Sequence, residues 1–261
     1  MVAPLFAGVD VGASATKLAL VDKAGRIKGK AVLPSGMDFA MAAGRALELA
    51  LEEAGATAAD VAATIASGYG RKNVGFAQGT RTEIACHARG AYFHFSEAMT
   101  LIDIGGQDNK IIKLDAAGNR LDFRMNRKCA AGTGAFLEEI ARRIGVPIEE
   151  METLARRSTE HVEIGSFCTV FAATEILALA RRGTRSEDIA RGAFRSVVKR
   201  VAEMDSFAGT VVATGGVVAH NPIVVELLSE IIGHEVRTPP LPQFAGAIGA
   251  ALYASDEENT C

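Results

Sequence analysis

The chain has 261 residues, of which 49% are hydrophobic, so it is long enough to bury one large core or two smaller ones without disulfide or metal support. Its 28 basic and 31 acidic side chains give a net charge of −3, which offers no electrostatic basis for binding nucleic acid or an anionic membrane. No apolar run approaches the roughly 20 residues of a spanning helix, and the first residues lack a basic segment followed by an apolar one. We therefore predict a cytoplasmic protein with neither nucleic acid nor membrane among its partners.

Two segments of the chain repeat one pattern. The pattern is Asp-hydrophobic-Gly, four further residues and Lys, with a second Asp that begins a Gly-containing turn twelve residues after the first. Its positions are Asp10, Gly12, Lys17 and Asp22 in the first copy, and Asp103, Gly105, Lys110 and Asp115 in the second. Apolar runs flank the turns, so each copy predicts strand, turn, strand, turn, strand.

Helical and strand patterns alternate along the rest of the chain. We predict helices over 40–54, 134–144, 170–181, 186–205 and 222–232, and strands over 61–65 and 211–214. The alternation predicts an α/β protein of two related domains, each a mixed sheet flanked by helices. We assign residues 1–98 plus 244–261 to the first domain and residues 99–243 to the second.

The first turn of the repeat has the composition of a phosphate-binding turn. Glycine lets a phosphate chain approach the backbone, hydroxyl groups and amides donate hydrogen bonds, and lysine neutralises phosphate charge. The segment consists of Gly12, Ala13, Ser14, Ala15, Thr16 and Lys17. The carboxylate of Asp10 is suited to a magnesium ion. An ordinary β-turn is the alternative, because Gly, Asp and Asn are common turn residues.

The second turn has the same permissive backbone in Gly105 and Gly106. It adds Gln107, a neutral side chain suited to orienting an attacking water, and Asp103 occupies the place that Asp10 has in the first copy. Two such turns facing one another would hold a triphosphate between the domains. Because the pattern occurs twice, we favour nucleotide binding.

Three segments together resemble the nucleotide-binding motifs of the actin/sugar-kinase/heat-shock-protein superfamily. The two turns are similar to its two phosphate motifs, and Val212-Ala-Thr-Gly215-Gly216, followed by Asn221-Pro222, is similar to its adenosine motif. The resemblance implies two actin-like (ribonuclease H-like) domains with ATP or ADP and Mg²⁺ in the cleft between them.

Cys129 and Cys168 each stand just ahead of a predicted helix, where Thr169 is suited to cap the second one. A helix N-terminus favours the thiolate, which is the form that binds metal. A [4Fe–4S] cluster usually takes four thiolates and one chain offers two, so a two-fold dimer would supply the other pair. The alternative is a buried apolar thiol, which we favour for Cys86 and Cys261.

The residues around both cysteines carry a more specific resemblance. Lys128-Cys129-Ala-Ala-Gly132-Thr-Gly134 and Cys168-Thr-Val-Phe-Ala resemble the cluster-ligand segments of ATP-dependent activators of 2-hydroxyacyl-CoA dehydratases and of benzoyl-CoA reductase ATPase subunits. The resemblance spans nearly the whole chain. It implies an ATPase of anaerobic metabolism, a dimer of identical or related subunits bridged by one [4Fe–4S] cluster. ATP hydrolysis would drive one low-potential electron from a donor such as ferredoxin or flavodoxin to a dehydratase or reductase acting on acyl-CoA.

The resemblance also implies roles by position. Asp10 and Asp103 would manage magnesium and its water, Gln107 would lie beside the γ-phosphate, and Cys129 and Cys168 would ligate iron. The remaining nucleotide contacts would come from both turns and from Gly132, Gly134, Gly215, Gly216 and Gln243. Ala13 and Ala15 stand where relatives tend to carry hydroxyl residues, so we expect the first turn to use its backbone.

Two other functions account for part of the pattern. A metabolite kinase of the same fold would use a carboxylate such as Asp103 on an acceptor hydroxyl, but it leaves Cys129 and Cys168 unexplained. A nucleotide-dependent regulatory or scaffold protein would need those cysteines only as structural residues. Iron content would separate the activator from both.

Overall fold

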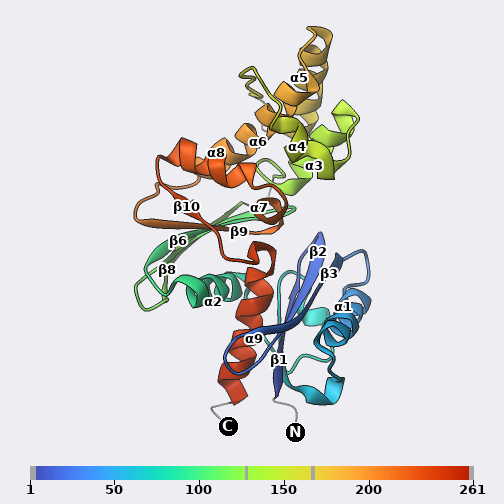
Figure 1. Cartoon of the computed structure of the whole chain (residues 1–261), viewed down its shortest axis with the longest axis vertical. Coiled ribbons are helices and arrows are strands. Elements are labelled where there is room, and N and C mark those ends of the chain that lie inside the picture. Colours follow the sequence, from blue (N-terminus) through green and yellow to red (C-terminus); the bar gives the residue numbers. More distant parts are fainter. Residues whose placement is uncertain (1–3, 127–128, 166–167, 259–261) are drawn as a thin grey trace. The chain divides into compact units, whose positions relative to one another are not determined.

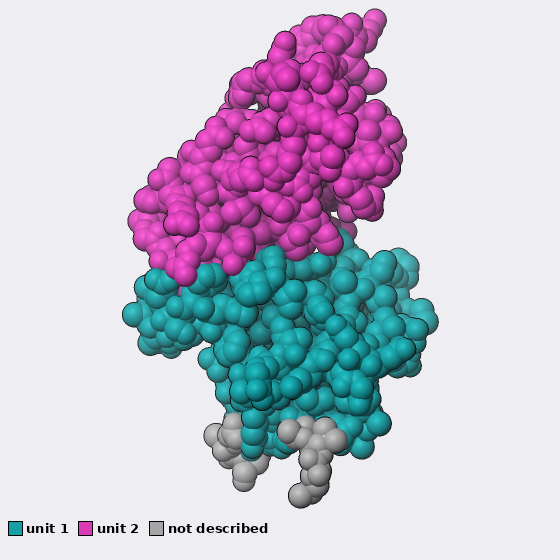
Figure 2. Space-filling model, in the orientation of Figure 1, with its two compact units in different colours: residues 1–98, 114–121, 239–261 teal, residues 99–113, 122–238 magenta. Residues whose placement is uncertain are grey.

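The computed structural model describes residues 4–126, 129–165 and 168–258 (Figure 1). Its internal contacts divide the chain into two units, coloured separately in Figure 2. The first unit comprises Met1–Ala98, Leu114–Leu121 and Pro239–Cys261, and the second comprises Met99–Lys113 and Asp122–Thr238. The predicted domains share the division after Ala98. The predicted first domain resumes at residue 244, five residues after the observed start at Pro239. The prediction also assigns residues 114–121 to the second domain, whereas the structure has them in the first unit.

The first unit is built on a mixed sheet with the strand order β3-β2-β1-β4-β5. Its strands are β1 (Leu5–Val11), β2 (Ala15–Val21), β3 (Ile27–Pro34), β4 (Val61–Ser67) and β5 (Gly79–Thr80). β1 pairs antiparallel with β2 and parallel with β4, and it is buried along its whole length. A central strand covered on both faces reads as a continuous apolar run, as the sequence of β1 does.

Helices cover both faces of this sheet. They are α1 (Phe39–Ala54), α2 (Glu83–Phe95) and α9 (Ala245–Glu258), with short 3₁₀ turns at η1 (Ala58–Asp60), η2 (Arg71–Asn73) and η4 (Pro242–Phe244). Alternate residues of β1 point to opposite faces. Val9 and its neighbours at odd positions share a core with α1, whereas Phe6 shares one with α9. A Cβ at Gly8 would overlap the backbone of α9, so this glycine lets the helix approach the strand closely.

The second unit repeats the mixed sheet, in the order β10-β9-β6-β7-β8. Its strands are β6 (Met99–Ile104), β7 (Asn109–Leu114), β8 (Arg120–Asn126), β9 (Thr210–Thr214) and β10 (Val236–Arg237). Its helices are α3 (Gly134–Ile144), α4 (Met151–Ala155), α5 (Thr169–Arg181), α6 (Ser186–Ala202), α7 (Gly216–His220) and α8 (Ile223–Ile232), with η3 at Ile148–Glu150. One large core joins Ile102 and Ile104 of β6 to these helices.

Both copies of the repeat fold into three consecutive strands, which confirms that prediction. α3 has the predicted bounds, and α1, α5 and α8 differ from prediction by one residue. α6 ends at Ala202, three residues early. Beyond it, Asp205 leaves the helix and pairs with Lys113 of β7 at 3.0 Å.

Candidate functional site

The first hairpin brings Asp10 and Lys17 together. They are cross-strand partners, and Lys17 Nζ lies 2.9 Å from Asp10 Oδ2. Gly12 N donates to Ala15 O at 3.1 Å and closes the turn, whose Ser14 is exposed. The buried Asp10 stands at the carboxyl end of β1, where it pairs in register with the end of the parallel strand β4. Ligands of α/β sheets bind at such carboxyl ends.

Thr16 lies inside the hairpin and is fully buried. Its Oγ1 is 2.9 Å from Ser35 Oγ, and Ser35 Oγ in turn donates to Gly12 O at 2.7 Å. A serine hydroxyl has one hydrogen, so the Thr16 hydroxyl donates to Ser35. The structure therefore places Thr16 and Ser35 beneath the turn, where they hold its shape, and leaves Ser14 as the exposed hydroxyl of the turn.

The second hairpin repeats the ion pair in a more buried form. Lys110 Nζ lies 3.0 Å from Asp103 Oδ2 and 2.7 Å from Asp108 Oδ1, and only 4% of the Lys110 side chain is exposed. Thr214 Oγ1, at the end of β9, donates to Asp103 Oδ1 at 3.1 Å. Both carboxylate oxygens of Asp103 are thus held in place.

The turn of the second hairpin packs against the start of α3. Gly134 N donates to Gly105 O at 3.0 Å, and Ala135 N donates to Gly106 O at 2.8 Å. These carbonyls satisfy amides that the first turn of a helix leaves without partners. Gln107 is exposed at the tip. The turn is therefore fixed on its helix side and open to solvent at Gln107.

The predicted adenosine-side residues fall in both units. Gly215 directly follows β9 and has φ +102°, and a Cβ there would overlap the carbonyl oxygen of Ile104. Gly216 begins α7. These glycines lie in the second unit, whereas Gln243 lies in η4 of the first unit and is partly buried.

Cys129 belongs to a short segment between β8 and α3. The cysteine is exposed, and its Sγ accepts from Ala131 N at 3.4 Å. Gly132 has φ +78°, and its carbonyl accepts from Asn109 Nδ2 at 2.7 Å. Asn109 is the first residue of β7. The segment that holds Cys129 is therefore bonded to the strand that directly follows the Gly105–Asp108 turn.

Cys168 is itself the N-cap residue of α5, with φ −75° and ψ 126°. The prediction that Thr169 caps this helix is wrong, because Thr169 already has helical geometry as the first residue of α5. The thiol is partly exposed. It stands at the N-terminal end of the helix, which is the positive end of the helix dipole.

The two thiols can be compared with what a [4Fe–4S] cluster requires, which is usually four thiolates. Helices α3 and α5, which follow the two cysteines, pack against each other within the second unit. Among the described residues, no three His, Cys, Asp or Glu side chains gather as a metal site. Cys129 and Cys168 therefore fit a cluster in donor type and accessibility, provided that further thiolates come from another chain.

The third cysteine with a described position, Cys86 of α2, is fully buried, as predicted. Burial raises the pKa of its thiol to about 12. Such a thiol stays protonated and unreactive at neutral pH. Cys261 lies outside the described residues.

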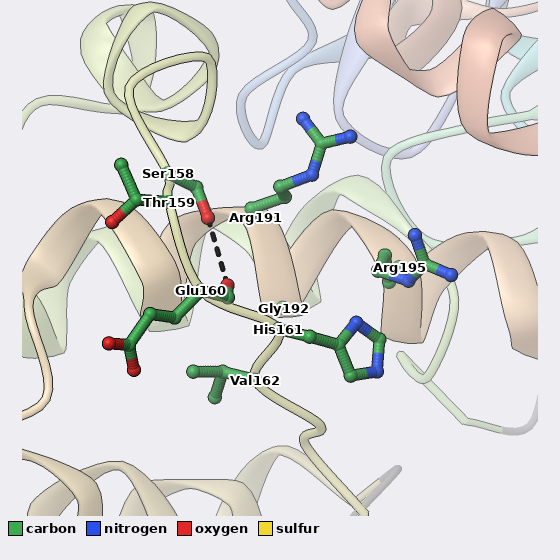
Figure 3. A pocket seen from close by; sticks show the side chains of 8 residues that line it. All are labelled: Ser158, Thr159, Glu160, His161, Val162, Arg191, Gly192 and Arg195. Carbon is green, nitrogen blue, oxygen red and sulfur yellow. Dashed lines mark hydrogen bonds between the residues drawn. The ribbon is translucent and has the colours of Figure 1, made fainter.

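The second unit also contains a cavity of about 330 Å³, which is not lined by the two hairpins or by the cysteines. The loop 158–162 runs across α6 there (Figure 3), and Ser158 Oγ lies 3.1 Å from the carbonyl oxygen of Glu160. Its lining consists of Ser158, Thr159, Glu160, His161, Val162, Arg191, Gly192 and Arg195. None of these is a predicted site residue.

Three residues support the candidate site in ways that the sequence alone does not predict. Ser35 carries no motif, Asn109 closes the predicted second turn, and each reaches its partner across 19 or more residues of chain. Thr214 belongs to the adenosine-type motif and directly precedes Gly215 and Gly216, which is the signal that could have indicated it.

Comparison with known proteins places the chain among ATPases and dehydratase activators. The profile of the BadF/BadG/BcrA/BcrD ATPase family matches residues 7–254. The chain is 41% identical to the (R)-2-hydroxyglutaryl-CoA dehydratase activating ATPase of Acidaminococcus fermentans over 251 residues, covering 95% of each chain. It superposes on the activator of the 2-hydroxyisocaproyl-CoA dehydratase from Clostridium difficile, solved with bound ADPNP, with a TM-score of 0.92, 38% identity and coverage of 98% and 96%.

The fold is shared more widely. A ROK-family glucokinase from Streptomyces griseus matches with a TM-score of 0.58 at 17% identity, over 97% of this chain and 99% of the enzyme. Likeness at that identity concerns the fold alone, and it agrees with the predicted actin/sugar-kinase architecture. Within the described residues, no helix is both long and apolar enough to span a membrane.

Proposed function

Because the chain belongs to the BadF/BadG/BcrA/BcrD ATPase family, we propose that it is an ATP-hydrolysing activator that delivers a low-potential electron to a 2-hydroxyacyl-CoA dehydratase. One observation carries the proposal. The β6–β7 hairpin, whose turn has the composition of a phosphate-binding turn, is hydrogen-bonded to the stretch that follows the exposed Cys129, within the second unit. The relatives described above are named for dehydratases, which favours a dehydratase over a benzoyl-CoA reductase as the partner.

In this proposal both hairpins bind the phosphates of ATP. The first hairpin offers its turn backbone, the Ser14 hydroxyl and Lys17. When ATP binds, the Lys17 ammonium leaves its ion pair with Asp10 and contacts phosphate oxygens instead. Asp10 and Asp103 hold Mg²⁺ and its water, and the exposed Gln107 orients the attacking water. The wider set of proposed nucleotide contacts is Gly12, Ala13, Ala15, Gly105, Gly106, Gly132, Gly134, Gly215, Gly216 and Gln243, with Thr16 acting through the shape of the turn.

A [4Fe–4S] cluster, when bound, would accept and release one electron. Cys129 and Cys168 are its proposed ligands in this chain, and both are free thiols outside the core. Two thiolates of the four must come from a second copy or a related subunit. We propose a second copy, which would also cover Val170 and Phe171, exposed by 72% and 68% directly after Cys168.

The remaining parts of the scheme follow from its chemistry. A one-electron carrier such as ferredoxin or flavodoxin would reduce the protein, and the reaction would take place in the cytoplasm. A metabolite kinase of the same fold shares the nucleotide site, but it gives no role to the thiols that precede two packed helices, α3 and α5.

Iron analysis tests the proposal. After anaerobic purification we expect close to four iron and four sulfide per dimer, lost in Cys129→Ala and in Cys168→Ala. Cys86→Ala is the matched control and should retain the iron, since Cys86 is buried in the other unit. Iron-free protein under conditions that preserve clusters would favour the kinase.

Hydrolysis tests the nucleotide site separately. Asp103→Asn and Gln107→Ala should each lower the rate of ATP hydrolysis by at least about a hundredfold, as loss of positioning groups does in related chemistry. Asp122→Asn, an exposed carboxylate on β8, is the control. Unchanged turnover in Asp103→Asn would refute the assigned site.

A further inference from the structure

The stretch from Cys129 into the first turn of α3 is bonded to the β6–β7 hairpin at three places. Two are backbone bonds, in which Gly134 N and Ala135 N donate to carbonyls of the turn at 3.0 and 2.8 Å. The third is the side-chain bond from Asn109 to Gly132 O, at 2.7 Å. A displacement of the turn is therefore transmitted to the start of α3 and to the residues just before it.

Asn109 makes the contact nearest to the cysteine. It is fully buried, and its acceptor Gly132 lies three residues after Cys129. A Cβ at Gly132 would lie 2.9 Å from Asn109 Nδ2. Only a residue without a side chain therefore lets the amide reach this carbonyl, and the φ of +78° there also favours glycine.

The other end of the Asn109 amide is unmatched. Asn109 Oδ1 is buried and has no hydrogen-bond donor among the described residues. The assignment of nitrogen and oxygen is set by Gly132, whose carbonyl requires the nitrogen as donor. A buried acceptor without a partner is destabilising, whereas an apolar side chain in the strand would avoid that penalty. Stability alone therefore does not account for asparagine at this position.

The backbone around Cys129 is also bonded to β8. Asn126 of β8 donates through Nδ2 to Cys129 O at 3.2 Å and to Ala131 O at 3.3 Å. Ala131 N in turn donates to the Cys129 sulfur. The cysteine thus sits on a short segment with one anchor in β8 and one in the phosphate-type hairpin.

We infer that Asn109 is a positioning residue that transmits the nucleotide state of the Gly105–Asp108 turn to the Cys129 thiol. The inference rests on the proposed function, because it requires nucleotide at this turn. ADPNP and ADP differ by the γ-phosphate beside Gln107, so they hold the turn differently. Asn109 carries that difference to Gly132, and the segment carries it to the thiol.

The test uses the full chain without a cluster, with its thiols reduced. At one fixed pH, Cys129 is alkylated with iodoacetamide in Mg²⁺–ADPNP and in Mg²⁺–ADP, and the rate is read by peptide-resolved mass spectrometry. Affinity for both nucleotides is measured on the same samples. For the wild type we expect rates that differ by about fivefold, the effect of one hydrogen bond made or broken.

Two variants distinguish a role of Asn109 in transmitting the nucleotide state from a general loosening of the backbone around Cys129. Asn109→Ala should bring the ratio of the two rates close to one while ADPNP still binds. Asn126→Ala, the matched control, removes the other anchor and should raise both rates without changing their ratio. If Asn109→Ala does not fold, Asn109→Val serves instead, because a β-branched side chain suits a strand.

The outcomes are distinct. A wild-type ratio of one with nucleotide bound, or a wild-type ratio that survives in Asn109→Ala or Asn109→Val, overturns the inference. Failure of the wild type to bind either nucleotide refutes the proposed function itself, and the inference with it.

Discussion

Lys110 Nζ lies 3.0 Å from Asp103 Oδ2, and both side chains are almost fully buried. Breaking such a pair from one side leaves a buried charge uncompensated. We expect Lys110→Met to lower the free energy of unfolding of the second unit by about 3–5 kcal/mol, measured by urea denaturation. Arg142→Met on α3 removes an exposed partner of Glu139 and should cost less than about 1 kcal/mol. Equal midpoints for the two variants would contradict the assigned burial of the pair.

Gly215 and Gly209 flank the same strand, β9, and both have positive φ, at +102° and +69°. We compare the effect of replacing each of them by alanine. At Gly209 the added Cβ has open space, so we expect a loss of about 1–2 kcal/mol from backbone strain alone. At Gly215 it overlaps the Ile104 carbonyl, so the loss should exceed about 3 kcal/mol. Thermal or urea unfolding of both variants measures the difference, and equal losses would argue against the close approach of β9 and β6.

Asp188 on α6 provides a pH-dependent contribution to stability. Burial alone would raise the pKa of its carboxyl, but hydrogen bonds from Glu160 N, the Ser158 hydroxyl and Thr159 N outweigh it and hold the pKa below 3.8. A depressed pKa in the folded state means that this contribution is complete above the unfolded pKa and is lost as the pH falls through the lower folded value.

We therefore expect Asp188→Asn to be less stable than the wild type at pH 7 by about 1–2 kcal/mol, because hydrogen bonds to a charged acceptor are the stronger ones. The difference should shrink below pH 3.8, the ordinary value for an aspartate. Urea unfolding at several pH values measures it, with Asp122→Asn as the exposed control. A difference that does not vary with pH would rule out the depressed pKa.

The thiols should differ sharply in reactivity. Because the pKa of Cys86 is raised to about 12 by burial, its alkylation should stay undetectable in the native protein between pH 7 and pH 9. In protein without a cluster, Cys129 and Cys168, which are accessible, should react within that range. Mass spectrometry of the separate peptides gives each rate. Rapid native labelling of Cys86 would show that α2 opens readily.

The parts of the fold that were predictable are those fixed by short-range pattern. The spacing of Asp10 and Lys17 places them opposite one another across a hairpin turn, and the spacing of Asp103 and Lys110 does the same. α3 was predictable because its apolar residues recur on one face and Gly145 ends it.

The parts that were missed depend on contacts distant in sequence. α9 is buried on nearly all sides and so lacks an amphipathic period, and α2 contains Gly90 where helix propensity is poor. A Cβ at Gly90 would overlap the backbone of Ala245 in α9. These helices hold each other in place, and neither sequence alone indicates it. The roles of Ser35 and Asn109 likewise depend on partners that only the folded chain brings near.

The position of α9 also sets an order of assembly during synthesis. One face of β1, including Gly8 and Phe6, is covered by a helix that begins at Ala245, whereas β1 itself ends at Val11. A nascent chain completes the strands of the first unit and then all of the second unit before that helix leaves the ribosome. Until then Phe6 lacks the part of its cover that α9 provides, so the earliest sheet to be made is the last to be finished, and it is the one exposed to chaperones and to aggregation for longest.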